Sequence, residues 1–281
     1  MSILKFRPEI WSARLLVALR QNLVYSAFIN RDYEGEIANA GDTVRITSIG
    51  RPTIKTYVPN VTNITFDQVT DSQRTLVVDQ ADYFAFAVDD VDARQAAGNV
   101  LPQSLDEASF AESNKIDQFI SSFYTSIQSS NQLGAIAVNS STTPSDAYDK
   151  VLVPLKIRLD KANVPSQGRN VVISPDLHGC LLRDSRFIKV NESGTSDGLR
   201  NGMVGRAAGF DIMLSNQTPT TGSDSVVIAG NNTAITFAEQ IAHIEALRPQ
   251  SSFSDAIKGL FLYGAKVIRP DSLASANVTV S

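Results

Sequence analysis

The first hydrophobic pattern along the chain is helical and lies in an amino-terminal arm, residues 1–39. Apolar residues recur there at four-residue steps, at Trp11, Leu15, Leu19 and Leu23. This spacing predicts an amphipathic helix that opens just after the Arg-Pro step at residues 7–8. A single helix cannot cover its own apolar side, so we expect the arm to lie against another surface.

From residue 40 the pattern changes to the two-residue alternation of β-strands. Val44 and Ile46 alternate with polar residues, residues 54–58 resume the alternation after a break, and a second extended stretch covers residues 64–78. These stretches are expected to pair as an extended hairpin within residues 40–80. With about 15 residues in each arm, the hairpin would reach on the order of 50 Å.

That reach exceeds the radius of gyration of about 19 Å that a body of this length has. A two-stranded ribbon that projects from its body is at best marginally stable by itself. Such a hairpin either curls around the body or projects from it, and if it projects, another chain must cover it. We expect it to be poorly buried within its own chain and to carry contacts between subunits.

A further strand is predicted at residues 83–88, with Phe84 and Phe86 on one side, and a short helix at residues 89–97. The longest helix is predicted to follow, from about residue 104 to residue 129. Ser104 and Glu107 form a capping box at its start. At 1.5 Å per residue this helix would be roughly 39 Å long and would serve as a rigid spine.

The second half of the chain alternates between helical and strand patterns after a polar linker at residues 139–144. Helices are predicted from Ser145 to Asn163, with a kink at Pro154, and from Ser174 onward. Strands are predicted at residues 171–173, 211–214, 226–229, 235–241 and 259–267, and a glycine-rich mobile loop at 191–209. No internal repeat is apparent, and the whole pattern indicates an α+β protein.

Composition and charge narrow the classes of function. Hydrophobic residues make up 43% and charged residues 19% of the 281 residues, as in an ordered globular protein. A net charge of -4 argues against a protein whose main task is to bind phosphate backbones. The first 31 residues nevertheless carry five cations and one acid, so the arm is suited to nucleic acid or an acidic partner, unless the cations simply form a solvated helix face.

Cysteine content and hydropathy bear on where the protein is made. The single cysteine, Cys180, excludes an internal disulfide and a zinc site of the paired-cysteine type. No signal peptide and no stretch of membrane-spanning length is found, which predicts synthesis in the cytoplasm and no membrane partner.

Candidate chemistry is sparse. Residues 194–198 match the G-x-S-x-G elbow around Ser196, with His243 downstream and Asp211 or Asp224 between them. The residues that follow are rich in glycine and predict no helix after the serine, so a hydrolase remains the minor reading. His178 and Cys180 stand two positions apart on one predicted helix and point to different faces, so Cys180 is better read as a core residue.

Two other short patterns are explained better by structure than by ligands. Asp89, Asp90 and Asp92 lack the glycine and the distal glutamate of a calcium-binding loop. Gly259 and Gly264 have the spacing of a phosphate loop, but Ala265 stands at the lysine position. No catalytic, cofactor or metal site is therefore predicted.

Several segments in combination resemble the major capsid proteins of tailed bacteriophages. The opening PEIWSARLLVALRQNLVYSAFINRDYEGEI resembles the amino-terminal arm of that family, and GDTVRITSIGRPTIKTYV its extended loop. TLVVDQADYFAFAVDDVDARQAA resembles the return into the peripheral domain. VVISPDLHGCLLRDSRFI resembles the axial domain, and SSFSDAIKGLFLYGAKVIRP the closing peripheral strands.

The resemblance implies a Hong Kong 97-like capsid fold with five parts. These are the arm (1–39), the extended loop (40–80), a peripheral domain with its spine helix (81–138), an axial domain (139–245), and closing peripheral strands (246–281). It implies a non-enzymatic shell subunit that forms pentamers and hexamers, with arm and loop lying over neighbouring subunits.

The implied partners and location follow from the same family. The shell would enclose double-stranded DNA without sequence-specific binding, be assembled in the host cytoplasm, and become the capsid of the virion. A separate scaffolding protein and a portal are the further partners that we expect, and whether a decoration protein also binds is left open by the sequence. Assembly contacts are expected from the arm and the loop, at Trp11, Arg14, Leu15, Arg20, Arg31, Arg45, Arg51, Lys55, Tyr57 and Arg74. An encapsulin-type compartment that packages an enzyme is the alternative with the same fold.

Overall fold

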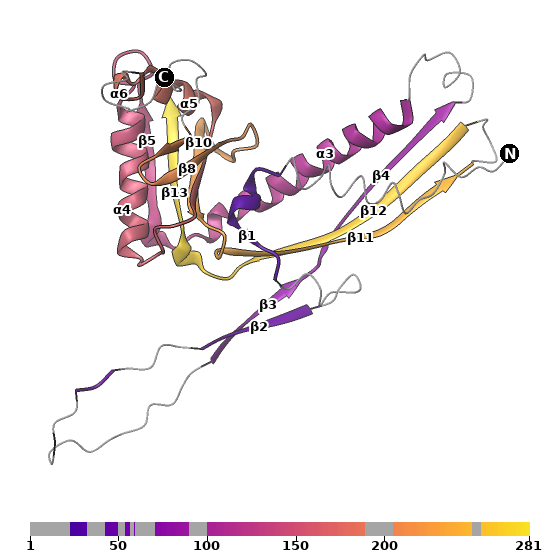
Figure 1. Cartoon of the computed structure of the whole chain (residues 1–281), viewed down its shortest axis with the longest axis horizontal. Helices are drawn as coiled ribbons and strands as arrows, with labels where there is room; N and C mark the ends of the chain where they lie inside the picture. Colours follow the sequence, from indigo (N-terminus) through magenta and orange to yellow (C-terminus); the bar gives the residue numbers. More distant parts are fainter. Residues whose placement is uncertain are drawn as a thin grey trace.

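Three sheets make up the architecture of the residues that the computed structural model describes, which are 23–32, 43–49, 54–56, 59, 71–89, 100–188, 205–248 and 254–281. One sheet has four strands, a second has seven, and the third is a ribbon of two (Figure 1). Together with the helices they form a mixed α+β fold.

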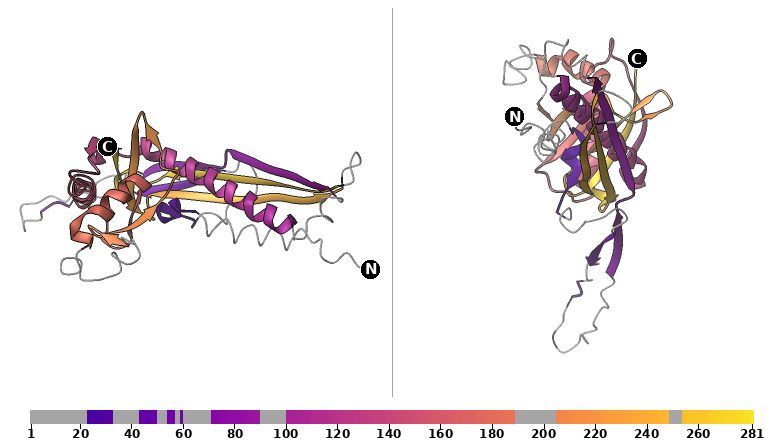
Figure 2. Two further views of the ribbon diagram at one scale, coloured as in Figure 1. Left: turned by 90° about the horizontal axis from the view of Figure 1, so that it is seen from above. Right: turned by 90° about the vertical axis from the view of Figure 1, so that its right-hand side faces the viewer.

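The four-stranded sheet is long and carries a helix along one face. Its strands, in spatial order, are β1 (Ile29–Asn30), β11 (Ile235–Leu247), β12 (Ser254–Val267) and β4 (Gln80–Asp89). β12 pairs antiparallel with both β11 and β4, whereas β1 runs parallel to β11. Helix α3 (Val100–Ser122) lies along this sheet (Figures 1 and 2), and a 3₁₀ turn, η3 (Phe123–Ser126), continues it.

In the seven-stranded sheet, a strand from the end of the chain lies second from one edge. The order is β5 (Gln132–Val138), β13 (Leu273–Val280), β10 (Asp224–Asn231), β6 (Arg169–Ile173), β8 (Phe210–Leu214) and β7 (Arg206–Ala207), with β9 (Thr220–Thr221) paired to β10. β13 thus separates β5, to which it is parallel, from β10, to which it is antiparallel.

Helices and turns complete the described elements. They are η1 (Tyr25–Phe28), η4 (Ser129–Asn131), the π-helical turn η5 (Ala147–Leu152), α4 (Val153–Lys161), α5 (Pro175–Arg183), α6 (Ser185–Ile188) and η6 (Pro270–Ser272). α5 begins as predicted, because the Ser174 hydroxyl accepts a hydrogen bond from the Leu177 amide at 3.4 Å and Pro175 occupies the first turn.

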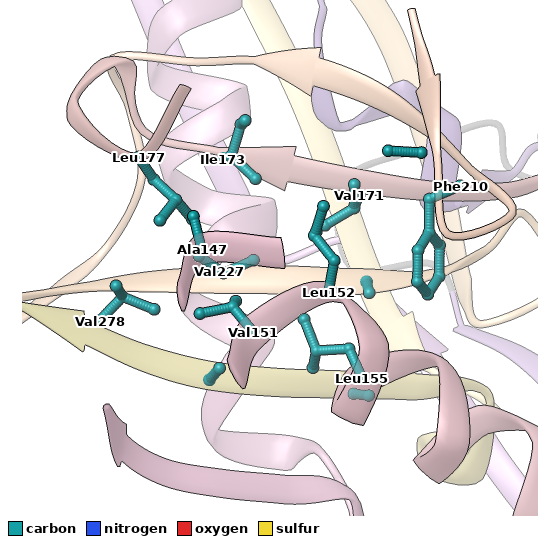
Figure 3. Close-up of a cluster of buried hydrophobic side chains, with 14 of the residues drawn as sticks. Ala147, Val151, Leu152, Leu155, Val171, Ile173, Leu177, Phe210, Val227 and Val278 are labelled. Atoms are coloured by element: carbon teal, nitrogen blue, oxygen red, sulfur yellow. The ribbon is translucent and has the colours of Figure 1, made fainter. Parts of the chain in front are cut away.

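Apolar side chains fill both faces of the seven-stranded sheet. On one face, Leu152 and Leu155 from the helical layer meet Val171, Val227 and Phe210 from the sheet (Figure 3). Burying each such side chain stabilises the fold by about 1.5–3 kcal/mol relative to exposure.

The opposite face of the seven-stranded sheet packs on the four-stranded sheet and on α3. β10 alternates, so that Val226 and Ile228 join this second core with Phe28, Ile120 and Phe237. One continuous apolar layer therefore fixes α3, η1 and the near ends of β11 and β12 to the seven-stranded sheet.

The ribbon consists of β2 (Thr43–Ile49) and β3 (Asp71–Val77), which pair antiparallel from Thr43 opposite Val77 to Ile49 opposite Asp71. It leaves the body where β3 passes into β4 (Figure 1). The predicted hairpin pairing is thus confirmed for these seven-residue strands. Residues 54–56 form no strand, contrary to the alternation that predicted one.

Other differences from the sequence predictions have local causes. The long helix begins at Val100, not at Ser104, because Pro102 is accommodated in its first turn; Ser104 is therefore inside the helix and no capping box starts there. The predicted bend at Pro154 takes the form of the π turn that precedes α4.

β5 and β13 were not predicted, and residues 206–207 of the predicted loop form β7. The arm helix and most of the helix at 89–97 lie outside the described residues.

Candidate assembly surface

One face of the four-stranded sheet lacks a covering element among the described residues. We call it the open face, and it comprises Ala81, Tyr83, Ala85 and Ala87 of β4, Lys258 and Leu260 of β12, and Leu247 of β11. The strand register places Tyr83 beside Leu260 and Ala85 beside Lys258. Tyr83 is 79% exposed, which leaves a large aromatic ring in solvent on a surface of small side chains.

Alternation along β4 and β12 explains why the other face is covered. Phe84 packs on Phe261 at 5.8 Å between ring centroids, and Tyr263 meets Phe119 of α3 edge-on at 5.4 Å. Since successive side chains on a strand point to opposite faces, covering Phe84 leaves Tyr83 uncovered. The open face follows from α3 lying on one side only.

Two glycines of β12 allow other parts of the chain to approach closely. A Cβ on Gly259 would overlap the ring of Phe84, and a Cβ on Gly264 would overlap the backbone of Val77 and Val78. The phosphate-loop spacing of these glycines therefore reflects packing of an aromatic ring and of the ribbon root.

The root of the ribbon is anchored in the body. Leu76 is fully buried and Ile46 is 6% exposed, in a small cluster with Ala238 and Ile268. The Arg74 guanidinium donates to the Val267 carbonyl at 2.7 Å. The expectation of a poorly buried hairpin is therefore wrong at its root, because its apolar side packs where β11 and β12 leave the second core.

Other described residues of the ribbon are exposed, on the outward side of its root and in the segment after β2. Val77, whose side chain points away from Leu76, is 39% exposed, and Ile54 is 97% exposed. An isoleucine side chain in full contact with water forgoes about 1.5–3 kcal/mol of burial energy. These two residues resemble the open face in offering apolar surface that their own chain does not cover.

The segment that follows the arm is held by a buried carboxylate of α3. Asp117 is 2% exposed and accepts hydrogen bonds from the amides of Val24, at 3.0 Å, and Tyr25, at 3.2 Å. Burial raises the pKa of Asp117 to about 6, although both amide bonds act in the opposite direction. Residues 23–30 are accordingly part of the body, with Tyr25 and Phe28 in the second core.

The predicted contact residues do not form one cluster in the part of the chain that the structure describes. Arg31 forms an ion pair with Glu239 and lies 5.2 Å from the centroid of Phe237. Arg74 is bound at the ribbon root, and Lys55 is exposed beside Ile54. Arg45 lies in β2 without a described side chain; Trp11, Arg14, Leu15, Arg20, Arg51 and Tyr57 lie outside the described residues.

Tyr83 and Leu260 were missed by reasoning from sequence, although a signal was present. Once Phe84 and Phe86 are assigned to the core side of a strand, Tyr83, Ala85 and Ala87 must share the other side. What the sequence does not show is that α3 covers one side only.

Three of the residues considered for chemistry, Asp211, Asp224 and Cys180, have structural roles. Asp211 is bound by Arg206 at 2.6 Å, Asp224 accepts a hydrogen bond from Thr279, and the 194–198 motif lies outside the described residues. Cys180 is fully buried, and burial raises the pKa of its thiol. Within the described ranges no cluster of acidic, histidine or cysteine residues suits a metal ion, and no helix has the length and apolar character to cross a bilayer.

Comparison with known proteins gives a consistent result. A family model described as phage capsid protein matches residues 73–276. A structure from Mycobacterium phage Che8 is similar at 32% identity, with a TM-score of 0.74 and 90% of each chain covered. No curated protein sequence matches.

More distant structures share the fold alone. The capsid of the cyanophage P-SCSP1u is similar at 15% identity with a TM-score of 0.71, covering 91% of this chain and 86% of the other. A virus-like particle from Pyrococcus furiosus is similar at 13% identity with a TM-score of 0.59, covering 95% and 98%. With a family model that spans most of its length, this chain belongs to the phage capsid protein family and is a major capsid protein, the subunit that forms the shell.

Proposed function

We propose that the open face and the ribbon are the surfaces through which copies of this chain build an icosahedral shell around double-stranded DNA. The observation that carries the proposal is Tyr83, a 79% exposed aromatic ring on a sheet face that the described chain leaves bare. Aromatic side chains are enriched at protein interfaces, where burial of one ring contributes strongly to binding.

The parts of the subunit are assigned by analogy with the Hong Kong 97-like capsid fold. The four-stranded sheet with α3 corresponds to the peripheral domain and spine helix, the seven-stranded sheet to the axial domain, and the β2–β3 ribbon to the extended loop. In this assignment pentamers and hexamers form around the axial domain. The exposed apolar residues of the ribbon support its placement on a neighbouring subunit.

The partners and location are proposed on the same basis. The shell lacks sequence-specific contacts to its DNA, consistent with the net charge of -4, and assembles in the host cytoplasm with a scaffolding protein and a portal. A decoration protein is a further candidate partner. The subunit has a structural role and no catalytic one, and its cohesion comes from many modest contacts repeated by symmetry.

Substitution of Tyr83 tests the proposal. We expect Tyr83→Glu to stay folded, because the side chain is exposed, but to reduce the yield of closed shells in electron micrographs at least about tenfold, since a carboxylate would be desolvated at each contact. Tyr83→Phe keeps the ring and should assemble normally. Normal shells from Tyr83→Glu would show that the open face is not an interface.

Composition of the native particles separates a virus shell from a compartment that packages an enzyme. Double-stranded DNA in particles from infected cells is the expected result. A co-purifying enzyme in place of DNA would contradict the proposed cargo while leaving the shell itself in place.

A further inference from the structure

Three carboxylates meet between α3 and the sheet beneath it. Glu112 projects from α3 and is 8% exposed, Asp82 comes from β4, and Glu239 comes from β11. The other two, Asp82 and Glu239, influence the protonation of Glu112, as does Lys115 one turn along the helix. The group therefore joins the helix to two strands of the sheet.

Cations at this junction are already bound to two of the acids. Lys115 forms an ion pair with Asp82, and Arg31 forms one with Glu239. Asp82 also accepts a hydrogen bond from the Tyr263 hydroxyl at 2.6 Å, which with burial raises the pKa of that tyrosine. Glu112 has no ion pair among the described residues, and its Oε1 atom is buried without a hydrogen-bond partner.

An ionised Glu112 would place a third negative charge beside those of Asp82 and Glu239, which already have cationic partners. Desolvation of an unpaired carboxylate is costly, and a like charge within a few ångströms adds to that cost. The neutral acid avoids both penalties, and its proton gives the buried group a donor toward its acidic neighbours.

We propose that Glu112 is a proton-operated clamp, which holds α3 firmly on the sheet when neutral and less firmly when ionised. The inference rests on charge compensation at the junction. Lys115 is bound to Asp82 and Arg31 to Glu239, whereas Glu112 has no ion pair among the described residues. Burial, followed by repulsion from Asp82, raises the pKa of Glu112 to about 7, which agrees with this geometry.

The direction of the pH effect follows from linkage. When α3 opens, Glu112 regains an ordinary pKa near 4.5, whereas in the closed state its pKa is about 7. The closed state therefore binds the extra proton between these values, and opening becomes easier as the pH rises through this range. Above about pH 7 the effect levels off, because Glu112 is ionised in both states.

Hydrogen exchange of the full-length protein measures the clamp directly. After correction for intrinsic exchange rates, amides of residues 105–122 in the wild type should exchange at least about tenfold faster at pH 7 than at pH 5. Amides of α4 provide an internal reference, since no carboxylate of this group contacts that helix. The measurement applies to free subunits and to shells, so it does not depend on the outcome of the assembly experiments.

Matched variants make the test specific. Glu112→Gln cannot titrate, so its acceleration should be at least about threefold smaller than in the wild type, with the remainder coming from Asp117 on the same helix. Glu107→Gln makes the same change at an exposed position of α3 and should behave as the wild type does. Equal acceleration in the wild type and Glu112→Gln, or none in the wild type, would overturn the proposal.

Discussion

Single residues decide how closely the strands and the ribbon approach each other. Because Gly259 has no Cβ, the ring of Phe84 can pack directly against it, and Gly264 leaves room in the same way for the backbone of Val77 and Val78. By contrast, a Cβ on Gly179 of α5 would meet nothing within 4 Å. Glycine is therefore required by close contact in β12 and not in α5.

Replacing these glycines by alanine should have opposite effects. Gly259→Ala is expected to lower the free energy of unfolding by about 1–3 kcal/mol, because the methyl group displaces the Phe84 ring. Gly179→Ala should raise it by about 0.5–1 kcal/mol, because alanine favours helix. Chemical denaturation of the purified variants checks both values, and a neutral Gly259→Ala would contradict the close contact.

Asp117 gives a second residue-level prediction, in its pH dependence. Its pKa is about 6 in the folded chain against 3.8 for an ordinary aspartate, so the folded state holds an extra proton between these values. The contribution of Asp117 to stability is greatest at the acid end and is lost as the pH rises. We expect Asp117→Asn to remove about 1–2 kcal/mol of the wild-type decrease in unfolding free energy between pH 4 and pH 6.

Unfolding curves at several pH values provide the measurement. Asp106→Asn changes an exposed acid of the same helix and should keep the wild-type pH profile. If Asp117→Asn also kept that profile, the buried carboxylate would not be the group that titrates.

At the scale of secondary-structure elements, the root of the ribbon has one buried side and one exposed side. Leu76 and Val77 are neighbours on β3, yet Leu76 is fully buried while Val77 is 39% exposed. Leu76 packs with Ile46 and Ala238, so a few side chains fix where the ribbon emerges.

Truncating Leu76 should release the ribbon root without unfolding the body. Leu76→Ala is expected to cost about 2–5 kcal/mol locally, because it leaves a cavity under the ribbon, and to speed hydrogen exchange in β2 and β3. Val77→Ala, on the exposed side of the same strand, should cost less than about 1 kcal/mol. Similar exchange in both variants would contradict the anchor.

The same elements show how far the sequence could be read. Strong alternation or a clear cap identified β2, β4, α5 and β10 correctly, because local pattern and tertiary environment agree there. β5 and β13 are rich in alanine and other small residues, as in LGAIAV and LASANVTV, so their alternation is weak. Their parallel pairing joins distant parts of the chain and has no local signal.

The candidate surface was predictable only in part. The length of the hairpin indicated that it would either project from the body or curl around it, but the burial of Leu76 depends on Ala238 and Ile268, which are distant in sequence. Likewise, alternation puts Tyr83 and Phe84 on opposite faces, whereas the choice of covered face depends on where α3 docks.

At the scale of the whole molecule, residues 23–30 are part of the body. The predicted arm extended to residue 39, but Tyr25, Phe28 and Ile29 are buried in the second core, and β1 pairs with β11. The amino-terminal segment thus has a part that completes the body and a preceding part, residues 1–22, that is a candidate for contacts with other subunits.

Two truncations should therefore behave differently. Removal of residues 1–22 is expected to leave soluble, folded protein that forms few or no correct shells, if the basic arm contacts neighbours or scaffolding protein. Removal of residues 1–31 also deletes buried Tyr25 and Phe28, so it should destabilise the body by at least about 5 kcal/mol and yield aggregated protein. Circular dichroism and electron microscopy of both variants distinguish the effects, and normal shells from the shorter truncation would refute a role for the arm.

The position of β13 in the seven-stranded sheet has a consequence for synthesis in the cell. β5 leaves the ribosome long before β13, yet the two are neighbours, and β13 also supplies the bridge to β10. A nascent chain without residues 273–280 lacks the strand that joins β5 to β10, together with the buried side chains that β13 supplies to the core beneath the helical layer. We therefore expect only chains that already include residues 273–280 to enter a growing particle, because a subunit without a complete sheet would make defective contacts with each of its neighbours.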